Sequence, residues 1–410
     1  MKIKTFYTVL FLFIVAVADA QVQGSWKGSL DAGVQKLTIV FHFKNNAEGK
    51  PTCTLDSPDQ GAKDIPATVL LSTADSVSVD IPVIGGSYRG RISGNSIRGT
   101  FTQGPASLPL NLEPGEVVYN RPQEPQPPYP YKTADFTFTN THAGATLSGT
   151  LTYPTNYRQG QKVPVVIMVS GSGLQNRDEE LMGHKPFKLI AHWLATHGMA
   201  SLRYDDRGFG ASTGDVAEAT TADFAEDASA GIEALRKTGK FSEVDVLGHS
   251  EGAAIAFILA ARGKADKIIA LAGPAVKGDT LLTEQYNIIM ESTGLQGFKR
   301  SVAQERAVAL ATKSTWMSHF LDYDPTADLK AIRCPVLALY GSKDLQVPPR
   351  LNIPALQKAL TANKHTVIKE YPGLNHIFQH CTTGLPTEYG SIEETLSTEV
   401  LDDIVEWLKR

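Results

Sequence analysis

The sequence predicts a two-domain protein, in which a small all-β domain precedes a larger α/β domain with a mostly parallel sheet. Three observations lead to this prediction. The chain has 410 residues, which is long for one domain. Its early part consists of short segments in which polar and apolar residues alternate. Its later part has continuous apolar runs that are separated by stretches of helical length.

The composition is that of an ordinary globular protein, with 42% hydrophobic and 20% charged residues. The formal net charge is −4 and no basic cluster is present, so nothing indicates binding to nucleic acid or to an anionic membrane surface. The three cysteines, Cys53, Cys334 and Cys381, are too few for a disulfide framework. Whether Cys334 and Cys381 pair stays open at this point.

Residues 1–20 have the pattern of a secretory signal peptide. Two lysines precede an apolar stretch, 6–17, which is short for a membrane span and leads to Ala18-Asp19-Ala20, an A-x-A cleavage site. We therefore expect an exported protein, periplasmic or extracellular, that is cleaved near Ala20 and has no membrane span afterwards. An uncleaved anchor is the alternative.

Residues 21–115 are predicted to form the all-β domain, because segments with a period of two are separated by turn residues and no helical run interrupts them. A sandwich or a partly open barrel is expected. The strands recognised most clearly are 36–43, 52–55, 76–81, 88–92 and 96–101. Residues 116–132 are rich in proline, which favours an extended, semi-rigid linker.

Residues 133–410 are predicted to form the α/β domain. Two alternating strands, 135–140 and 145–153, lead into continuous apolar strands, which are typical of a parallel sheet covered by helices on both faces. These strands are 163–169, 200–204, 244–247, 267–272, 336–340 and 366–371, and the helices are 186–196, 222–237, 252–261, 352–362 and 392–409. Between about 275 and 330 the pattern is helical without a strand, which predicts an inserted helical cap.

The segment Gly248-His249-Ser250-Glu251-Gly252 lies between an apolar strand and a helix of small residues. It has the G-x-S-x-G pattern of a nucleophile elbow, in which a serine hydroxyl is exposed on a strained strand-to-helix turn. The glycines have a steric reason, because such a turn brings main-chain segments too close for side chains. The motif predicts Ser250 as the nucleophile of a serine hydrolase, although G-x-S-x-G alone also arises by chance.

A serine nucleophile needs a base, and the base needs a group that orients it. Asp344 follows the strand 336–340 and His376 follows the strand 366–371. The carboxyl ends of parallel strands meet at one edge of the sheet, so we expect both residues near Ser250. Taken singly, Asp344 would be a turn residue and His376 a surface-loop histidine, but the order serine, acid, histidine is that of hydrolase triads.

Two further segments make a resemblance specific: Ser170-Gly171-Ser172-Gly173 and Asp206-Arg207-Gly208-Phe209-Gly210, each after an apolar strand. With GHSEG, GSKD and NH, they resemble the α/β-hydrolase superfamily, in particular exported bacterial esterases with a small β domain before the catalytic one. The resemblance covers about 133–410 well. It implies an α/β-hydrolase fold with a helical cap and a Ser250, Asp344, His376 triad that acts through an acyl-enzyme.

By position, the resemblance implies that the main-chain N–H groups of Glu251 and Ser172 form the oxyanion hole. Relatives usually have a histidine where Ser170 stands, so the hydrogen bonds that stabilise this loop are in question. Arg207 is interpreted as a structural tie between loops. Recognition of a substrate carboxylate by Arg207 or Arg177 is the alternative.

No cofactor is expected, and neither is a metal. His376 and His380 are four residues apart and His192 lies near His197, but neither pair has an acidic ligand cluster beside it.

We expect a carboxylesterase that acts on a small-molecule ester with a small or medium acyl group, with a carbohydrate-linked ester as one option. The fold does not choose between esters, thioesters and peptides, so a serine peptidase or a thioesterase is the enzyme alternative. A glycan-binding or docking protein with an accessory hydrolase domain is the alternative of a different class. The aromatic residues Trp316, Phe320 and Tyr323 either line a substrate pocket or pack the cap. The oligomeric state stays open.

Overall fold

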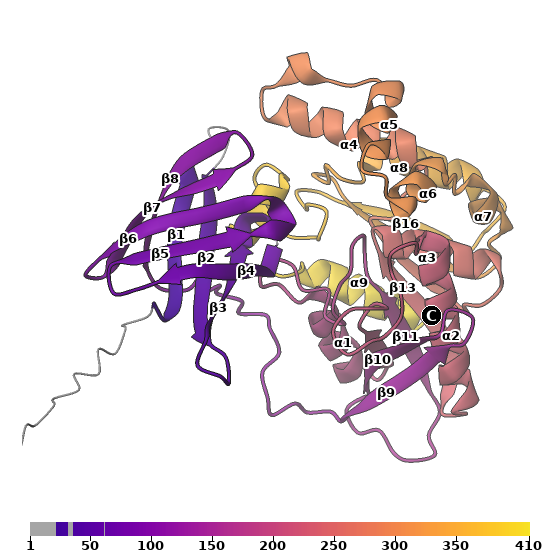
Figure 1. The fold of residues 1–410 in the computed structure, drawn as a ribbon. Helices are drawn as coiled ribbons and strands as arrows, with labels where there is room; N and C mark the ends of the chain where they lie inside the picture. Colours follow the sequence, from indigo (N-terminus) through magenta and orange to yellow (C-terminus); the bar gives the residue numbers. More distant parts are fainter. Residues whose placement is uncertain (1–21, 32–35, 61) are drawn as a thin grey trace, which may run out of the picture. The chain divides into compact units, whose positions relative to one another are not determined.

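The computed structural model describes residues 22–31, 36–60 and 62–410. It divides into two compact units between Val118 and Tyr119, and Figure 1 colours the chain from one unit to the other. The predicted signal peptide, 1–20, lies outside the described residues. Within these ranges, every helix is too short or too polar to cross a bilayer.

The first unit is a closed barrel in which each strand is antiparallel to the next one along the chain. The strands are β1 (Gly24–Asp31), β2 (Lys36–Asn45), β3 (Pro51–Ser57), β4 (Ala62–Ser72), β5 (Ser76–Ile81), β6 (Gly86–Ser93), β7 (Ser96–Gln103) and β8 (Ala106–Pro114), with 3₁₀ turns η1 (Pro58–Gln60) and η2 (Pro82–Ile84). The barrel closes where β1 pairs with β8 and Trp26 lies opposite Pro114.

The prediction of an all-β domain is confirmed, but the expected sandwich or partly open barrel is wrong. The sequence patterns identified five strands and missed β1, β4 and β8, of which β1 and β8 are the two that close the sheet. Closure pairs the edges that an open sheet would leave exposed.

Apolar side chains fill the barrel interior. Along β5 the buried residues are Val77, Val79 and Ile81, which alternate with partly exposed ones. Tyr88 is fully buried, and its hydroxyl donates a hydrogen bond to the carbonyl of Leu110. The interior is therefore a packed core that satisfies its buried hydroxyl internally.

The second unit contains one sheet in the order β16-β15-β14-β13-β11-β12-β10-β9. Its strands are β9 (Thr133–Asn140), β10 (Ala145–Thr152), β11 (Val163–Val169), β12 (Ala200–Tyr204), β13 (Phe241–His249), β14 (Ile268–Leu271), β15 (Val336–Gly341) and β16 (Thr366–Tyr371). β9 and β10 are antiparallel to their neighbours. The other six strands are parallel to one another and lie side by side in the order β12, β11, β13, β14, β15 and β16. The predicted α/β fold with a mostly parallel sheet is confirmed.

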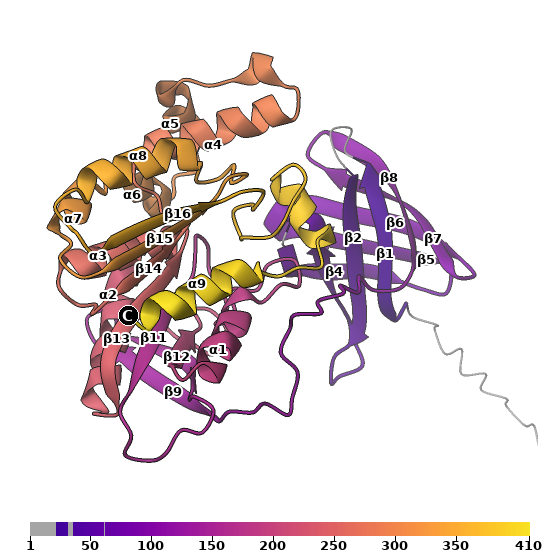
Figure 2. The same cartoon turned by 180° about the vertical axis from the view of Figure 1, so that it is seen from behind.

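Helices cover both faces of this sheet. α1 (Pro186–Thr196) packs against β12 and against α9 (Thr398–Leu408), and Figure 2 shows both helices in front of the strands. α2 (Thr221–Lys237) and α3 (Glu251–Ala261) pack against each other and against β13 from the opposite face. α8 (Pro349–Ala359) follows β15, and the turn η4 (Pro386–Ser391) precedes α9.

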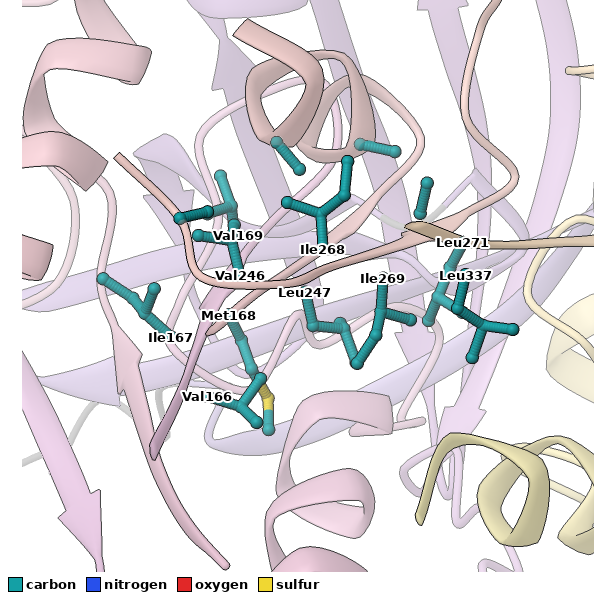
Figure 3. Close-up of a cluster of buried hydrophobic side chains, with 14 of the residues drawn as sticks. Val166, Ile167, Met168, Val169, Val246, Leu247, Ile268, Ile269, Leu271 and Leu337 are labelled. Carbon is teal, nitrogen blue, oxygen red and sulfur yellow. The ribbon is translucent and has the colours of Figure 1, made fainter. Parts of the chain in front are cut away.

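The centre of the sheet has apolar side chains on both sides, as Figure 3 shows for β11, β13, β14 and β15. β14 and β15 are buried along their whole length, because helices exclude water from each face. This double burial explains why these strands read as continuous apolar runs. The same burial places the polar loops of the unit at the strand ends.

Between β14 and β15 the chain forms four helices and no strand, in the region predicted to be a cap. They are α4 (Gly278–Ser292), α5 (Val302–Leu310), α6 (Thr315–Asp322) and α7 (Thr326–Ala331), with the short turn η3 (Gln296–Phe298) after α4.

The proline-rich segment is held against the second unit from Tyr119 onward, whereas a semi-rigid spacer was expected over 116–132. The guanidinium of Arg121 donates hydrogen bonds to the main-chain carbonyls of Met182, Gly390 and Ile392. These contacts involve residues far along the chain, so the local proline content gives no sign of them.

One carboxyl group is buried in the parallel sheet without a partner. Asp245 on β13 has no exposed surface, and within the described part of the chain neither of its carboxyl oxygens has a hydrogen-bond partner. Burial raises the pKa of Asp245 from 3.8 to about 8, and Glu243 adds to the rise. The folded chain therefore retains a proton that the unfolded chain releases, so this residue lowers stability as the pH rises from about 4 to about 8.

We predict that Asp245→Asn, which cannot ionise and has nearly the same shape, stabilises the protein at pH 8. The expected gain in the free energy of unfolding is about 2 kcal/mol or more, because each unit of pKa shift corresponds to about 1.4 kcal/mol. Thermal unfolding of both proteins between about pH 5 and pH 8 measures it. The difference in melting temperature should grow with pH, and parallel pH dependences would contradict the prediction.

Candidate active site

Ser250 lies at the junction of β13 and α3. Its φ is 55° and its ψ is −118°, a combination that residues other than glycine rarely adopt. The amide of Ser250 donates a hydrogen bond of 2.8 Å to the carbonyl of Leu271, at the end of the neighbouring strand. The sequence motif therefore forms a strained strand-to-helix turn at the edge of the sheet, as an elbow requires.

The glycines on either side of Ser250 are required by close main-chain contact. A Cβ atom on Gly248 would lie 2.0 Å from the carbonyl oxygen of Gly252. A Cβ atom on Gly252 would lie 2.0 Å from the carbonyl oxygen of Val169, at the end of β11. Both distances are far below contact distance, so no side chain fits at either position without moving the main chain.

His376 and Asp344 form the second part of the site. The imidazole Nδ1 of His376 lies 2.8 Å from Oδ2 of Asp344. Oδ1 of Asp344 accepts hydrogen bonds of 2.8 Å from the amides of Gln346 and Val347, which leaves Oδ2 for the imidazole. Because the carboxylate accepts at Oδ2, Nδ1 carries a proton and Nε2 is left as the basic nitrogen.

The loop that carries His376 is fixed by its own polar side chains. Oδ1 of Asn375 accepts hydrogen bonds from the amides of Ile377 and Gln379. The side-chain amide of Gln379 in turn donates to the carbonyl of Glu394. Asn375 and Gln379 have no exposed surface, so this turn is a buried, satisfied network rather than a free surface loop.

The structure brings Ser250 and His376 to the same edge of the sheet through His249. Nε2 of His249, the residue before Ser250, lies 3.0 Å from the carbonyl oxygen of His376. Over the described ranges, no hydrogen bond joins the Ser250 hydroxyl to the His376 imidazole. Hydrogen bonds between a nucleophile and its base are often long without substrate, so the geometry leaves the predicted triad as a candidate.

Two main-chain N–H groups are available beside Ser250. Glu251 is the first residue of α3, where amides have no acceptor within the helix. The amide of Ser172 donates no hydrogen bond within the described part of the chain, whereas the amide of Gly171 is occupied by Oε1 of Glu179 at 2.8 Å. The two amides predicted from the sequence to form the oxyanion hole therefore have no acceptor among the described residues.

Ser170 supplies hydrogen bonds that stabilise the loop after β11, where relatives usually have a histidine. Its hydroxyl lies 2.9 Å and 3.1 Å from the two carboxyl oxygens of Asp206. Oδ2 of Asp206 also accepts the amide of Gln175 at 2.8 Å. Burial raises the pKa of Asp206 to about 7, although these hydrogen bonds oppose the rise. The serine therefore holds the loop where relatives usually have a histidine.

The two arginines considered for substrate recognition are already paired. The guanidinium of Arg177 makes two hydrogen bonds to Asp205, of 3.0 Å and 2.7 Å. The guanidinium of Arg207, which is buried, makes two hydrogen bonds to Asp227, of 2.6 Å and 2.7 Å. Both bidentate pairs join neighbouring loops and helices, which supports the structural interpretation.

Glu251 connects the nucleophile turn to the cap. Its Oε1 accepts hydrogen bonds from the hydroxyl of Thr221 at 2.6 Å and from the indole N–H of Trp316 at 2.8 Å. Trp316 stacks on Phe320, with ring centroids 5.4 Å apart. Phe320 and Tyr323 line a cavity of about 10 Å³ that also touches Glu251. The cap aromatics therefore both pack and line space beside the nucleophile turn.

A second cavity lies on the other side of Glu251. Its volume is about 20 Å³, room for about one water molecule, and Ser170, Gly171, Asp206 and Glu251 are among its lining residues. Both cavities have Glu251, the residue after Ser250, among their lining residues.

The sequence reasoning missed the pair Glu179 and His249. Nδ1 of His249 lies 3.0 Å from Oε1 of Glu179, and both side chains are buried. Burial by itself lowers the pKa of His249, but the charge of Glu179 and the hydrogen bonds outweigh it, so the pKa is raised. The sequence does show a histidine inside the G-x-S-x-G motif and three consecutive acidic residues after Arg177. Nothing in either segment indicates that the two pair with each other.

The remaining candidates lie apart from the site. His380 is exposed and contacts Glu394 at 2.9 Å. Cys53, Cys334 and Cys381 are free thiols, so Cys334 and Cys381 do not pair. Among the described residues, no cluster of three or more histidine, cysteine, aspartate or glutamate side chains has the geometry to hold a metal ion.

Comparisons with known proteins agree with this architecture. A family model described as serine aminopeptidase, S33 (Hydrolase_4) matches residues 184–326. Esterase EstD of Thermotoga maritima is 27% identical over 277 residues, which is 64% of this chain and 65% of that protein. This chain therefore spans about two thirds of the length of its curated relative.

The solved structures that this chain is similar to have low sequence identity to it. The esterase Pf2001 of Pyrococcus furiosus is 17% identical with a TM-score of 0.49, and the match covers 72% of this chain and 99% of that one. Est1E from Butyrivibrio proteoclasticus, solved with ferulic acid bound, is 18% identical with a TM-score of 0.47, covering 67% and 100%. With the sheet order, the family model and the curated relative taken together, the second unit has an α/β-hydrolase fold, and an all-β barrel precedes it in the chain.

Proposed function

We propose that this protein is a serine carboxylesterase in which Ser250 is the nucleophile, His376 the general base and Asp344 the group that orients the base. One observation carries the proposal: the buried hydrogen bond of 2.8 Å between His376 and Asp344 lies at the same sheet edge as the strained turn of Ser250. A hydroxyl is a weak nucleophile at neutral pH, and this arrangement supplies both a basic nitrogen and its orientation.

The reaction proceeds in two halves. His376 accepts the proton of the Ser250 hydroxyl at Nε2 while Oγ attacks the ester carbonyl, and the amides of Glu251 and Ser172 stabilise the negative charge that develops on the carbonyl oxygen. The protonated imidazole then donates its proton to the leaving alcohol, which leaves an acyl-enzyme on Ser250. A water molecule, deprotonated by His376, releases the acid and restores the serine.

The esters proposed as substrates have short acyl groups. Relatedness to esterase EstD supports ester chemistry over other acyl transfers. The two cavities that touch Glu251 have volumes of about 20 Å³ and 10 Å³, and we propose that an acyl group held beside them is short. A carbohydrate-linked alcohol remains one form of such a substrate, because nothing about the acyl side excludes a polar leaving group.

We predict that Ser250→Ala lowers kcat on a short-chain nitrophenyl ester by about 10⁴-fold or more, as removal of a triad nucleophile does elsewhere. The same variant should lose covalent labelling by a fluorophosphonate probe while its circular dichroism spectrum is unchanged. Ester hydrolysis that survives in Ser250→Ala would reject the assigned nucleophile.

Cys381→Ala is the matched control for this test. The thiol of Cys381 lies on the loop that follows His376, and its Sγ contacts the carbonyl of Gly373 at 3.4 Å. Burial raises the pKa of this thiol, so little thiolate is present near neutral pH. We expect this variant to retain labelling and turnover.

A substrate panel separates the proposed esterase from its rivals. We predict that kcat/KM falls as the acyl group of a nitrophenyl ester is lengthened from acetyl to octanoyl, because longer chains need the cap to move. Amino-acid anilides of the same leaving-group type should be hydrolysed far more slowly. Faster turnover of anilides would favour a peptidase, which the serine aminopeptidase description of the matching family model makes the strongest enzyme rival.

A binding or docking protein with an inactive hydrolase unit would give a different result in the labelling experiment. Folded protein of that kind would not react with the fluorophosphonate probe at Ser250, since labelling requires an activated hydroxyl. The probe therefore separates the two classes of function without knowledge of the natural substrate.

A further inference from the structure

We propose that Glu179 and His249 form a positioning pair that holds the oxyanion loop and the His376 loop against the nucleophile turn. This inference rests on the proposed function, because it assigns a role to two residues that do not touch the reacting atoms. It is carried by hydrogen bonds that join three segments far apart in the sequence.

The first junction is at one carboxylate oxygen. Oε1 of Glu179 accepts the amide of Gly171 at 2.8 Å and lies 3.0 Å from Nδ1 of His249. Gly171 precedes Ser172, whose amide is a proposed oxyanion donor. A single side chain therefore connects the oxyanion loop after β11 to the last residue of β13.

The second junction is at the other ring nitrogen. Nε2 of His249 lies 3.0 Å from the carbonyl oxygen of His376, and the two rings have centroids 4.7 Å apart. His249 is covalently attached to Ser250. The main-chain carbonyl of the proposed base is thus hydrogen-bonded to the side chain of the residue that precedes the proposed nucleophile.

The chemistry of these partners determines the protonation of His249. A carbonyl oxygen only accepts hydrogen bonds, so Nε2 donates. An ionised carboxylate that already accepts the amide of Gly171 also accepts from Nδ1, so both ring nitrogens carry protons. This arrangement favours the imidazolium form of His249: burial lowers its pKa, but the charge of Glu179 and the hydrogen bonds outweigh burial and raise it. The pair is buried, and removing one partner of a buried ion pair leaves the other uncompensated.

The groups around His249 include the imidazole of His376, whose ring centroid lies 4.7 Å from that of His249, and several polar or charged groups. Glu179 and Asp344 favour its charged form, and the carbonyl of His376 accepts its second proton. Asp206 lies close enough to Glu179 for the two carboxyl groups to affect each other. Because the pKa of His249 is raised above its usual value, the imidazolium persists to higher pH than that of a free histidine and is lost as the pH rises through the raised pKa.

The conformation of Glu179 supports a positioning role. Its φ is 51°, in the left-handed region that residues other than glycine seldom adopt. The surrounding structure must maintain such a conformation, and the two hydrogen bonds at Oε1 are among the contacts that hold the residue in place.

A positioning role predicts a specific kinetic pattern. Displacement of an oxyanion donor or of the base by a fraction of an ångström weakens interactions that exist only in the transition state, so kcat falls while KM changes little. A loss of overall stability would instead reduce the amount of active protein and leave kcat per active site unchanged.

The test compares Glu179→Gln and His249→Gln with the wild-type full-length chain on a short-chain nitrophenyl ester. Active sites are counted by fluorophosphonate labelling, so kcat refers to folded, reactive protein. We expect kcat per labelled site to fall about 10-fold to 100-fold in both variants, with KM within about 2-fold of wild type. Glu179→Gln retains an acceptor for Gly171 and should be the milder change.

The pH profile supplies a second readout. Wild-type kcat should decline at alkaline pH when His249 loses its second proton, and this decline should be absent in His249→Gln, which has no such proton. His42→Gln is the matched control. In the barrel, His42 makes a similar pair of 2.9 Å with Asp56, and its replacement should leave kcat, KM and the pH profile unchanged.

Values of kcat per labelled site that equal wild type in both variants would overturn the positioning role, as would an alkaline decline that persists in His249→Gln. Either result would leave the proposed function intact, because that function fails only if Ser250→Ala stays active or the wild-type chain cannot be labelled.

Discussion

Main-chain contact at the turn of Ser250 is the constraint on which the rest of the site depends. A Cβ atom on Gly252 would clash with the carbonyl oxygen of Val169, and a Cβ atom on Gly248 would clash with the carbonyl oxygen of Gly252. This contact holds a serine at a positive φ, at a cost of about 1–3 kcal/mol. Burial of α3, whose residues from Glu251 to Ala260 are all shielded from solvent, offsets that cost.

The parallel sheet brings the other groups of the proposed mechanism to the turn of Ser250. β11, β13, β15 and β16 each end at one edge, and the loop after each strand carries one functional group of the proposed mechanism. Strand order therefore decides which loops meet. A sheet in which β16 did not lie beside β15 would separate the acid from the base while leaving every local motif unchanged.

Buried charges around the site are nearly all paired, which sets them apart from Asp245 in the sheet. Arg207 neutralises Asp227, His249 neutralises Glu179, and Glu251 receives two hydrogen bonds where it has no cation. The pair of His249 and Glu179 joins segments that the proposed mechanism needs in register. Asp245 has no hydrogen-bond partner among the described residues, and burial raises its pKa.

The sequence alone determined the fold class, the elbow and the candidate residues Ser250, Asp344 and His376, because glycine sterics and strand-end polarity are local signals. Closure of the barrel, the docking of Arg121 and the pair of Glu179 with His249 were decided only by the tertiary structure. Each of these depends on contacts between residues that are distant in the chain. Residue type shows which groups can pair, but only the packed fold selects which of them do.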